Sequence, residues 1–325
     1  MDKPKIFLTR KINPGAEETL RRYAEVEIWT EQTPPTYETI IEKMHVVDGI
    51  LTMLCDKIDR LAIEQAQNLR VISQMAVGFD NIDIQAATAK KIPVGHTPGV
   101  LTETTADMAW GLLMAVARRI VEGNNEVHQG IWRSWGPDVL CGQEVYGSTL
   151  GIIGFGRIGQ AMARRAAGFN MNVLYHDLRP EPESENKINA RFVTLDELIA
   201  GSDFISVHTY LSDKTRHMIS RPQFKQMKKT AMIINTARGP IIDQDALIWA
   251  LENRIIAGAG LDVTDPEPIS VDSPLLKMSN VVVTPHIASA STITRERMAY
   301  ICAENLLAGL RGEQLRFTAN PAVYD

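Results

Sequence analysis

The sequence predicts two doubly wound parallel-sheet α/β domains, with one inserted in the other. Short runs rich in β-branched residues alternate with helical stretches along the chain, an alternation typical of parallel sheets covered by helices. The chain has 325 residues, enough for about two domains at roughly 100–200 residues each. The last expected helix has no strand after it, so it can return to the first domain and make that domain discontinuous.

The first domain is expected to contain at least three strands and two helices. The strands are residues 5–9, 49–52 and 70–74, and the helices are 37–44 and 59–66. Thr97-Pro98-Gly99 is a turn signal that closes this part of the chain.

A long helix is expected from Thr102 to Arg119. Its apolar residues do not stay on one face, and a helix that is apolar nearly all round must be buried on several sides. The pattern leaves two interpretations open, a central core helix or a subunit interface.

The second domain is expected to contain six strands separated by helices, as in a doubly wound nucleotide-binding domain. A final helix covers about residues 292–309. The predicted domains are therefore 99–288, and 1–98 together with 289–325. The six strands are 149–153, 172–176, 204–207, 231–235, 256–261 and 281–283.

Composition argues against several classes of protein. The net charge is −5, whereas nucleic-acid binding usually leaves a basic footprint. No segment approaches the roughly 20 apolar residues of a membrane span. The three cysteines, Cys55, Cys141 and Cys302, form no C-x-x-C pair, which fits a reducing compartment with no disulfide framework or structural zinc. We therefore expect a cytoplasmic protein without a metal.

A glycine-rich motif lies between the first expected strand of the second domain and the helix that follows this strand. Gly154, Gly156 and Gly159 form a G-x-G-x-x-G in which Arg157 and Ile158 fill the spacer. The glycines permit a tight turn, close approach of a pyrophosphate, and close packing of helix on strand. N–H groups at the helix start would face the phosphate charge. The alternative is a glycine-rich turn with no ligand.

Asp177 ends the next expected strand, about 20 residues beyond the glycines. An acid there accepts hydrogen bonds from a ribose 2′-OH and repels a 2′-phosphate, so the sequence predicts NAD(H) rather than NADP(H). Arg179 offers a partial phosphate contact. The alternative for Asp177 is a turn residue at a strand end.

Three successive strands end in residues suited to hydride-transfer chemistry. Arg238 follows the 231–235 strand, Asp262 and Glu267 follow the next, and His286 follows the third. Ligands bind at the carboxyl ends of strands in open α/β sheets. A histidine supplies or removes a proton near neutral pH, and a neighbouring glutamate raises its pKa. Loop charges or caps are the alternative interpretation of each residue.

These motifs resemble the D-isomer-specific 2-hydroxyacid dehydrogenase family over essentially the whole chain. The matching stretches are 76–83, 154–159, 235–239, 261–268 and 285–289. Within the family the sequence is most similar to the glyoxylate/hydroxypyruvate reductase branch, through residues 97–102, 134–137, 262–264 and 305–312. The resemblance implies a Rossmann-type NAD domain inserted in a flavodoxin-like substrate domain.

The resemblance also implies a mechanism for reducing a small 2-oxo acid such as glyoxylate or hydroxypyruvate. His286 would be the general acid, Glu267 would keep it protonated, and Arg238 would bind the substrate carboxylate. Backbone N–H groups of Val77 and Gly78 would grip the same carboxylate, in a cleft between the domains. Further cofactor contacts are implied for Thr105, Arg157, Ile158, His208, Thr209, Thr236, Ala237 and Asp262.

Members of the family are usually homodimers, which favours the interface interpretation of the 102–119 helix. In the similar branch a tryptophan near Trp135 reaches into the partner's substrate site; a simple interface aromatic is the alternative. Two departures stand out. Tyr210 replaces a usual proline, and the branch often prefers NADPH where Asp177 favours NADH. Other expectations are a 3-phosphoglycerate or phosphite dehydrogenase, and a non-catalytic NAD-sensing scaffold like the corepressors of this fold.

Overall fold

The computed structural model describes residues 3–325. The chain folds into two compact units. The first contains the chain up to Leu101 together with Ala290–Asp325, and the second is Thr102–Ser289. These boundaries lie within three residues of the domain limits expected from the sequence.

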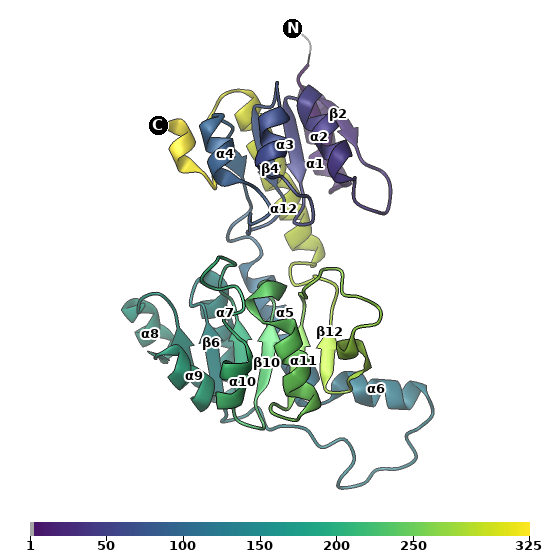
Figure 1. The fold of residues 1–325 in the computed structure, drawn as a ribbon, viewed down its shortest axis with the longest axis vertical. Helices are drawn as coiled ribbons and strands as arrows, with labels where there is room; N and C mark the ends of the chain where they lie inside the picture. Colours follow the sequence, from purple (N-terminus) through teal and green to yellow (C-terminus); the bar gives the residue numbers. More distant parts are fainter. Residues whose placement is uncertain (1–2) are drawn as a thin grey trace. The chain divides into compact units, whose positions relative to one another are not determined.

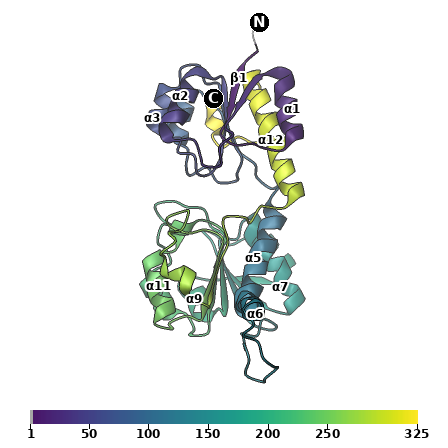
Figure 2. The same cartoon turned by 90° about the vertical axis from the view of Figure 1, so that its right-hand side faces the viewer.

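The first unit has a five-stranded parallel sheet in the order β2-β1-β3-β4-β5. This is the flavodoxin-like strand order, in which the winding reverses between β1 and β3. Figure 2 shows α1 and α12 on one face of this sheet and α2 and α3 on the other. The strands are β1 (Lys5–Leu8), β2 (Glu25–Ile28), β3 (Gly49–Thr52), β4 (Val71–Gln74) and β5 (Val94–Gly95). The helices are α1 (Pro14–Tyr23), α2 (Tyr37–Val46), α3 (Arg60–Gln65), α4 (Ile84–Ala89) and α12 (Thr292–Leu310).

Helix α12 joins this unit from the far end of the chain, as the lack of a following strand suggested. It packs against β3, β4 and α1. A Cβ on Gly309 would lie 2.5 Å from Val71 Cβ, so only a glycine allows this approach of helix to strand. The Ser73 hydroxyl also donates to the Cys302 carbonyl, at 3.1 Å.

The second unit has a seven-stranded parallel sheet in the order β12-β11-β10-β9-β6-β7-β8. Six of these strands were expected from the sequence; the seventh, β8, is an edge strand of three residues that is too short to show a pattern. The strands are β6 (Thr149–Ile153), β7 (Asn172–His176), β8 (Ala190–Phe192), β9 (Phe204–Val207), β10 (Met232–Asn235), β11 (Gly258–Leu261) and β12 (Val281–Val283).

Helices cover both faces of this second sheet (Figure 1). Figure 2 shows α9 and α11 on one face and α5 and α7 on the other. The helices are α5 (Thr102–Ala117), α6 (Ile120–His128), α7 (Arg157–Ala166), α8 (Pro182–Ile188), α9 (Leu195–Gly201), α10 (Arg221–Gln226) and α11 (Gln244–Glu252). Short 3₁₀ turns are Ala167–Phe169, Gly239–Ile241, Pro274–Lys277 and, in the first unit, Pro321–Tyr324.

Helix α5 is a core helix within the chain. It packs against β10, β11 and α7, with Leu112 and Leu113 buried. The expected 102–119 helix is α5, which ends at Ala117. Arg119 then adopts a left-handed conformation (φ 53°) that separates α5 from α6, a helix that was not expected from the sequence. Across residues 3–325, no helix is long and apolar enough to cross a membrane.

Candidate active site

The three strands whose ends carry the expected catalytic residues are neighbours in the second unit. β10, β11 and β12 pair side by side and parallel, so their carboxyl ends lie at one edge of the sheet. Arg238 follows β10, Asp262 and Glu267 follow β11, and His286 follows β12. The topology therefore brings a cation, two acids and an imidazole to one edge, where ligands bind in such folds.

His286 and Glu267 form a direct pair. His286 Nδ1 lies 2.5 Å from Glu267 Oε1, and both side chains are part-exposed, at 25% and 42%. Nδ1 donates to the carboxylate in this arrangement, which fixes the imidazole tautomer and ring orientation. Nε2 makes no hydrogen bond to any residue of the described chain 3–325. It is thus the nitrogen available for proton transfer.

Asp262 holds the segment that carries His286. Its carboxylate is buried and accepts hydrogen bonds from the N–H groups of Ile287 (2.9 Å) and Ala288 (2.7 Å) and from the Thr284 hydroxyl (2.6 Å). The His286 N–H donates to the Asp262 carbonyl at 2.9 Å. His286 itself has a left-handed backbone (φ 53°), a conformation that costs a non-glycine residue about 1–2 kcal/mol.

This anchoring role of Asp262 could not be predicted from the sequence, because it depends on the backbone path after β12. The expected contact of Asp262 with the nicotinamide amide stays a prediction.

Arg238 lies on a loop that Asn235 shapes. The Asn235 side chain accepts from the Ala237 N–H at 3.0 Å and donates to the Arg238 carbonyl at 2.8 Å. The next residue, Gly239, packs so tightly on the loop after β11 that a Cβ would lie 1.9 Å from the Thr264 carbonyl oxygen. The loop of Arg238 and the loop that leads to Glu267 are therefore in direct contact.

The glycine-rich turn has the geometry that a pyrophosphate requires. Gly154 has φ +91°, and a Cβ there would lie 2.6 Å from the Thr209 nitrogen. A Cβ on Gly159 would lie 2.1 Å from the Gly154 carbonyl oxygen, whereas one on Gly156 would meet no atom within 4 Å. Helix α7 begins at Arg157 without a side-chain cap. The open space at Gly156 and the uncapped helix start suit a phosphate group.

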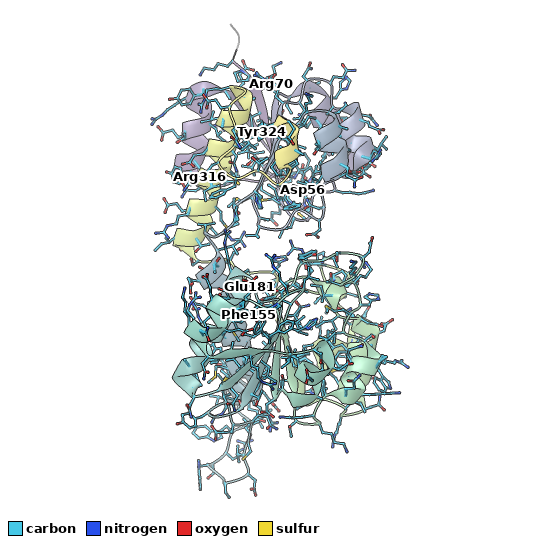
Figure 3. The ribbon with its side chains drawn as sticks, turned by 90° about the vertical axis from the view of Figure 1, so that its left-hand side faces the viewer. Asp56, Arg70, Phe155, Glu181, Arg316 and Tyr324 are labelled. Atoms are coloured by element: carbon cyan, nitrogen blue, oxygen red, sulfur yellow. The ribbon has the colours of Figure 1, made fainter. Side chains whose placement is uncertain are left out.

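Asp177 is held at the rim of this turn. Its carboxylate accepts from the N–H groups of Phe155 (2.7 Å) and Leu178 (2.6 Å). The ring of Tyr175 stacks on Phe155 with 3.8 Å between centroids, and its hydroxyl donates to Glu185 and accepts from the Glu181 N–H. Tyr175 thus contacts both Phe155 and Glu181, which are labelled in Figure 3.

Two of the other expected cofactor contacts have distinctive environments. The His208 ring lies 2.8 Å from the Ser206 hydroxyl, and burial lowers the pKa of His208 to about 4. The Thr236 hydroxyl at the end of β10 is buried and has no hydrogen-bond partner within residues 3–325. Such an orphaned hydroxyl fits a site completed by a polar ligand.

The remaining expected contacts vary in exposure. Thr105 is buried in α5, Arg157 is exposed at the start of α7, and Ile158, Thr209 and Ala237 are part-buried. These residues all belong to the second unit.

Val77 and Gly78 follow β4 in the first unit. Neither backbone N–H makes a hydrogen bond within the described chain, so both are available to an anion. The carbonyl of Val77 contacts His96 Nδ1 at 3.0 Å. The Asn81 side chain ties the same loop to the Met53 carbonyl at 3.1 Å, a positioning role that the sequence analysis did not identify.

Trp135, the tryptophan expected at the partner's substrate site or at an interface, belongs to the second unit. It is 81% exposed on the segment that follows α6.

The strand order, the glycine-rich turn and the His286–Glu267 pair define a dehydrogenase that binds a nicotinamide dinucleotide. Comparison with known families gives the same class, since residues 110–288 match the D-isomer specific 2-hydroxyacid dehydrogenase, NAD binding domain. The chain belongs to the D-isomer specific 2-hydroxyacid dehydrogenase family, in its glyoxylate reductase branch.

Individual relatives support this assignment. A glyoxylate reductase from Korarchaeum cryptofilum (strain OPF8) is 48% identical over 96% of this chain and 94% of its own length. A glyoxylate reductase structure from Paecilomyes thermophila has 31% identity and a TM-score of 0.87, covering 98% of this chain and 99% of its own. An NADPH-dependent glyoxylate/hydroxypyruvate reductase from Sinorhizobium meliloti, in complex with NADP and malonate, has 30% identity and a TM-score of 0.86, covering 99% and 98%.

Proposed function

We propose that this dehydrogenase reduces glyoxylate, or a similarly small 2-oxo acid such as hydroxypyruvate, with NADH. The observation that carries the proposal is the His286–Glu267 pair at 2.5 Å, at the carboxyl edge of a dinucleotide-binding sheet. The names of the relatives agree with this substrate class, since those with 44–48% identity are called glyoxylate reductases.

The proposed division of roles follows from the chemistry of each group. The bound nicotinamide supplies a hydride. His286 Nε2 donates a proton to the C2 oxygen of the substrate, and Glu267 stabilises the charged imidazole before that transfer. The guanidinium of Arg238 forms a charge-assisted contact with the substrate carboxylate. In the first unit, the unbonded N–H groups of Val77 and Gly78 are suited to donate to a carboxylate.

The preference for NADH over NADPH rests on Asp177. Its carboxylate is fixed by two N–H groups at the rim of the glycine-rich turn, where it accepts from a ribose 2′-OH and repels a 2′-phosphate. Arg179, the nearby cation, lies 3.6 Å from Glu181 and its side chain is 85% exposed. A solvated arginine beside an acid offers little to offset the charge of Asp177.

A homodimer is also part of the proposal, with the region after α5 as the interface. Large apolar side chains are exposed along α6 and the segment after it: Ile120, Val121, Val127, Ile131, Trp132, Trp135, Val139 and Tyr146. Large exposed apolar side chains gathered along one stretch of the chain are typical of protein–protein contacts. Trp135 would then be either a buried interface aromatic or a residue offered to the partner's substrate site.

A kinetic panel tests the proposed reaction. The full-length enzyme is assayed by NADH and NADPH oxidation with glyoxylate, hydroxypyruvate, pyruvate and 2-oxobutyrate. We expect the highest kcat/KM for glyoxylate or hydroxypyruvate, with NADH at least about tenfold better than NADPH, or about 1.4 kcal/mol. No turnover of any small 2-oxo acid would contradict the proposal, as would activity confined to phosphite or 3-phosphoglycerate oxidation.

A further inference from the structure

A cavity of about 600 Å³ lies at the carboxyl edge of the first unit's sheet. Its walls include residues that follow β1, β2, β3 and β4, together with the first turn of α12. All of them belong to the first unit. The winding of this sheet reverses between β1 and β3, and ligands bind in the crevice at such a reversal. The volume is also typical of small-molecule sites, which are roughly 300–1,000 Å³.

Three cations line the cavity. Arg10 and Lys11 come directly after β1, and Arg295 lies in the first turn of α12. The Arg10 guanidinium donates to the Thr9 carbonyl at 2.5 Å and lies 3.5 Å from Cys55 Sγ. Within residues 3–325 Arg10 makes no ion pair with a carboxylate. Its head group is thus fixed by neutral partners and keeps its charge for an anion.

The rest of the wall is largely apolar. Ile12, Trp29, Met53 and Met75 line the cavity. The Trp29 indole N–H donates to the Thr33 carbonyl at 2.7 Å, which fixes the ring as a flat surface. Thioether side chains adapt to the shape of an apolar ligand and contact aromatic rings favourably. The wall therefore suits a ligand with an apolar body.

Two acids, Glu31 and Glu296, also line the cavity. Set against the three cations, they leave a net formal charge of one positive. A net charge of one positive matches a monoanion better than a dianion such as a phosphate monoester.

We propose that this cavity binds a monocarboxylate with an apolar body. The carboxylate contacts Arg10 and Lys11, and the apolar body lies against Trp29 and Met53. Glyoxylate has no such body, so this is a second ligand class beyond the proposed substrate. The site is formed within the first unit and requires neither Arg238 nor His286.

The test is titration calorimetry of the full-length protein with phenylacetate, which has no 2-oxo group to reduce. The Arg238→Gln variant serves as background, because it removes the proposed substrate-carboxylate contact and keeps the cavity. We expect phenylacetate to bind this protein, and the added Arg10→Gln change to weaken binding at least about tenfold through loss of a charge-assisted contact. Arg22→Gln on α1, whose side chain is 66% exposed and pairs with Glu18, is the matched control and should leave the affinity unchanged.

Two further probes test the ligand class. Acetate, which lacks the apolar body, should bind at least about tenfold more weakly than phenylacetate, and inorganic phosphate should also bind more weakly. Equal affinity for either probe would overturn the proposed class. Retained NADH binding and an unchanged circular dichroism spectrum establish that each variant is folded. If Arg10→Gln does not fold, Lys11→Gln applies the same test at an exposed position.

The proposal is overturned if phenylacetate does not bind the Arg238→Gln protein, or binds equally well after the change at Arg10. These measurements require no turnover. Their failure therefore leaves the reductase proposal standing, and a failure of the reductase assay leaves this one standing.

Discussion

At the scale of single residues, cofactor choice is proposed to depend on one carboxylate. Asp177→Ala removes the acceptor for a ribose 2′-OH and the repulsion of a 2′-phosphate. We expect the ratio of kcat/KM with NADH to that with NADPH to fall at least about tenfold, or about 1.4 kcal/mol. Glu183→Ala, which also removes one negative charge but at an exposed position on α8, should leave the ratio unchanged. A ratio that survives Asp177→Ala would show that this acid does not select the cofactor.

His208 makes the stability of the protein depend on pH. Burial lowers its pKa to about 4, against about 6.5 in an unfolded chain. The unfolded state therefore takes up this proton first. The stability linked to a neutral His208 is fully present above pH 6.5 and is lost progressively as the pH falls toward 4.

Denaturant titrations at pH 7.5 and pH 5 measure this effect. The unfolding free energy of the wild type should fall more over this interval than that of His208→Gln. Equal losses in the two proteins would show that His208 titrates normally.

At the scale of elements, two glycines of the glycine-rich turn have different roles, Gly159 in folding and Gly156 in cofactor binding. Gly159→Ala places a methyl group 2.1 Å from the Gly154 carbonyl oxygen, and such overpacking destabilises a protein by about 1–3 kcal/mol. Gly156→Ala meets no atom within 4 Å, so its stability should stay within about 1 kcal/mol of wild type. NADH binding should nevertheless weaken in Gly156→Ala, because the methyl group enters the space that a pyrophosphate needs.

Thermal unfolding without cofactor and NADH fluorescence titration distinguish the two variants. A lower Tm for Gly156→Ala than for Gly159→Ala would contradict the assignment of these glycines.

The sequence predicted most elements well, because their signals are local. Buried strands such as β6 and β10 are continuous apolar runs between turn residues, and the glycine motif marks the start of α7. The helix α6 escaped prediction, since it is short and neither glycine nor proline marks the left-handed Arg119 before it. The anchoring by Asp262 escaped as well, because its partners lie 22 to 26 residues away in the sequence. Such contacts exist only once β11 and β12 pair.

At the scale of the whole molecule, the exposed apolar side chains after α5 predict self-association. Figure 1 shows the segment after α6 as an extended loop of the second unit. Light scattering after size exclusion should give twice the 36.1 kDa chain mass. Val127→Glu combined with Trp132→Glu should shift the protein toward the single-chain mass, because charges in an apolar interface are strongly unfavourable.

Val271→Glu is the matched control for the dimer, since Val271 is 85% exposed in another part of the second unit. It should leave the mass unchanged. A wild-type mass of one chain at micromolar concentration would rule out the proposed dimer.

The most direct test of the account is the kinetics of His286→Ala with glyoxylate and NADH. Because Nε2 is the proposed proton donor to the C2 oxygen, kcat should fall about 10²–10⁴-fold. The affinity for NADH should stay within a factor of about three. A kcat within a few-fold of wild type would contradict the proposal that the His286–Glu267 pair carries the proton in this reaction.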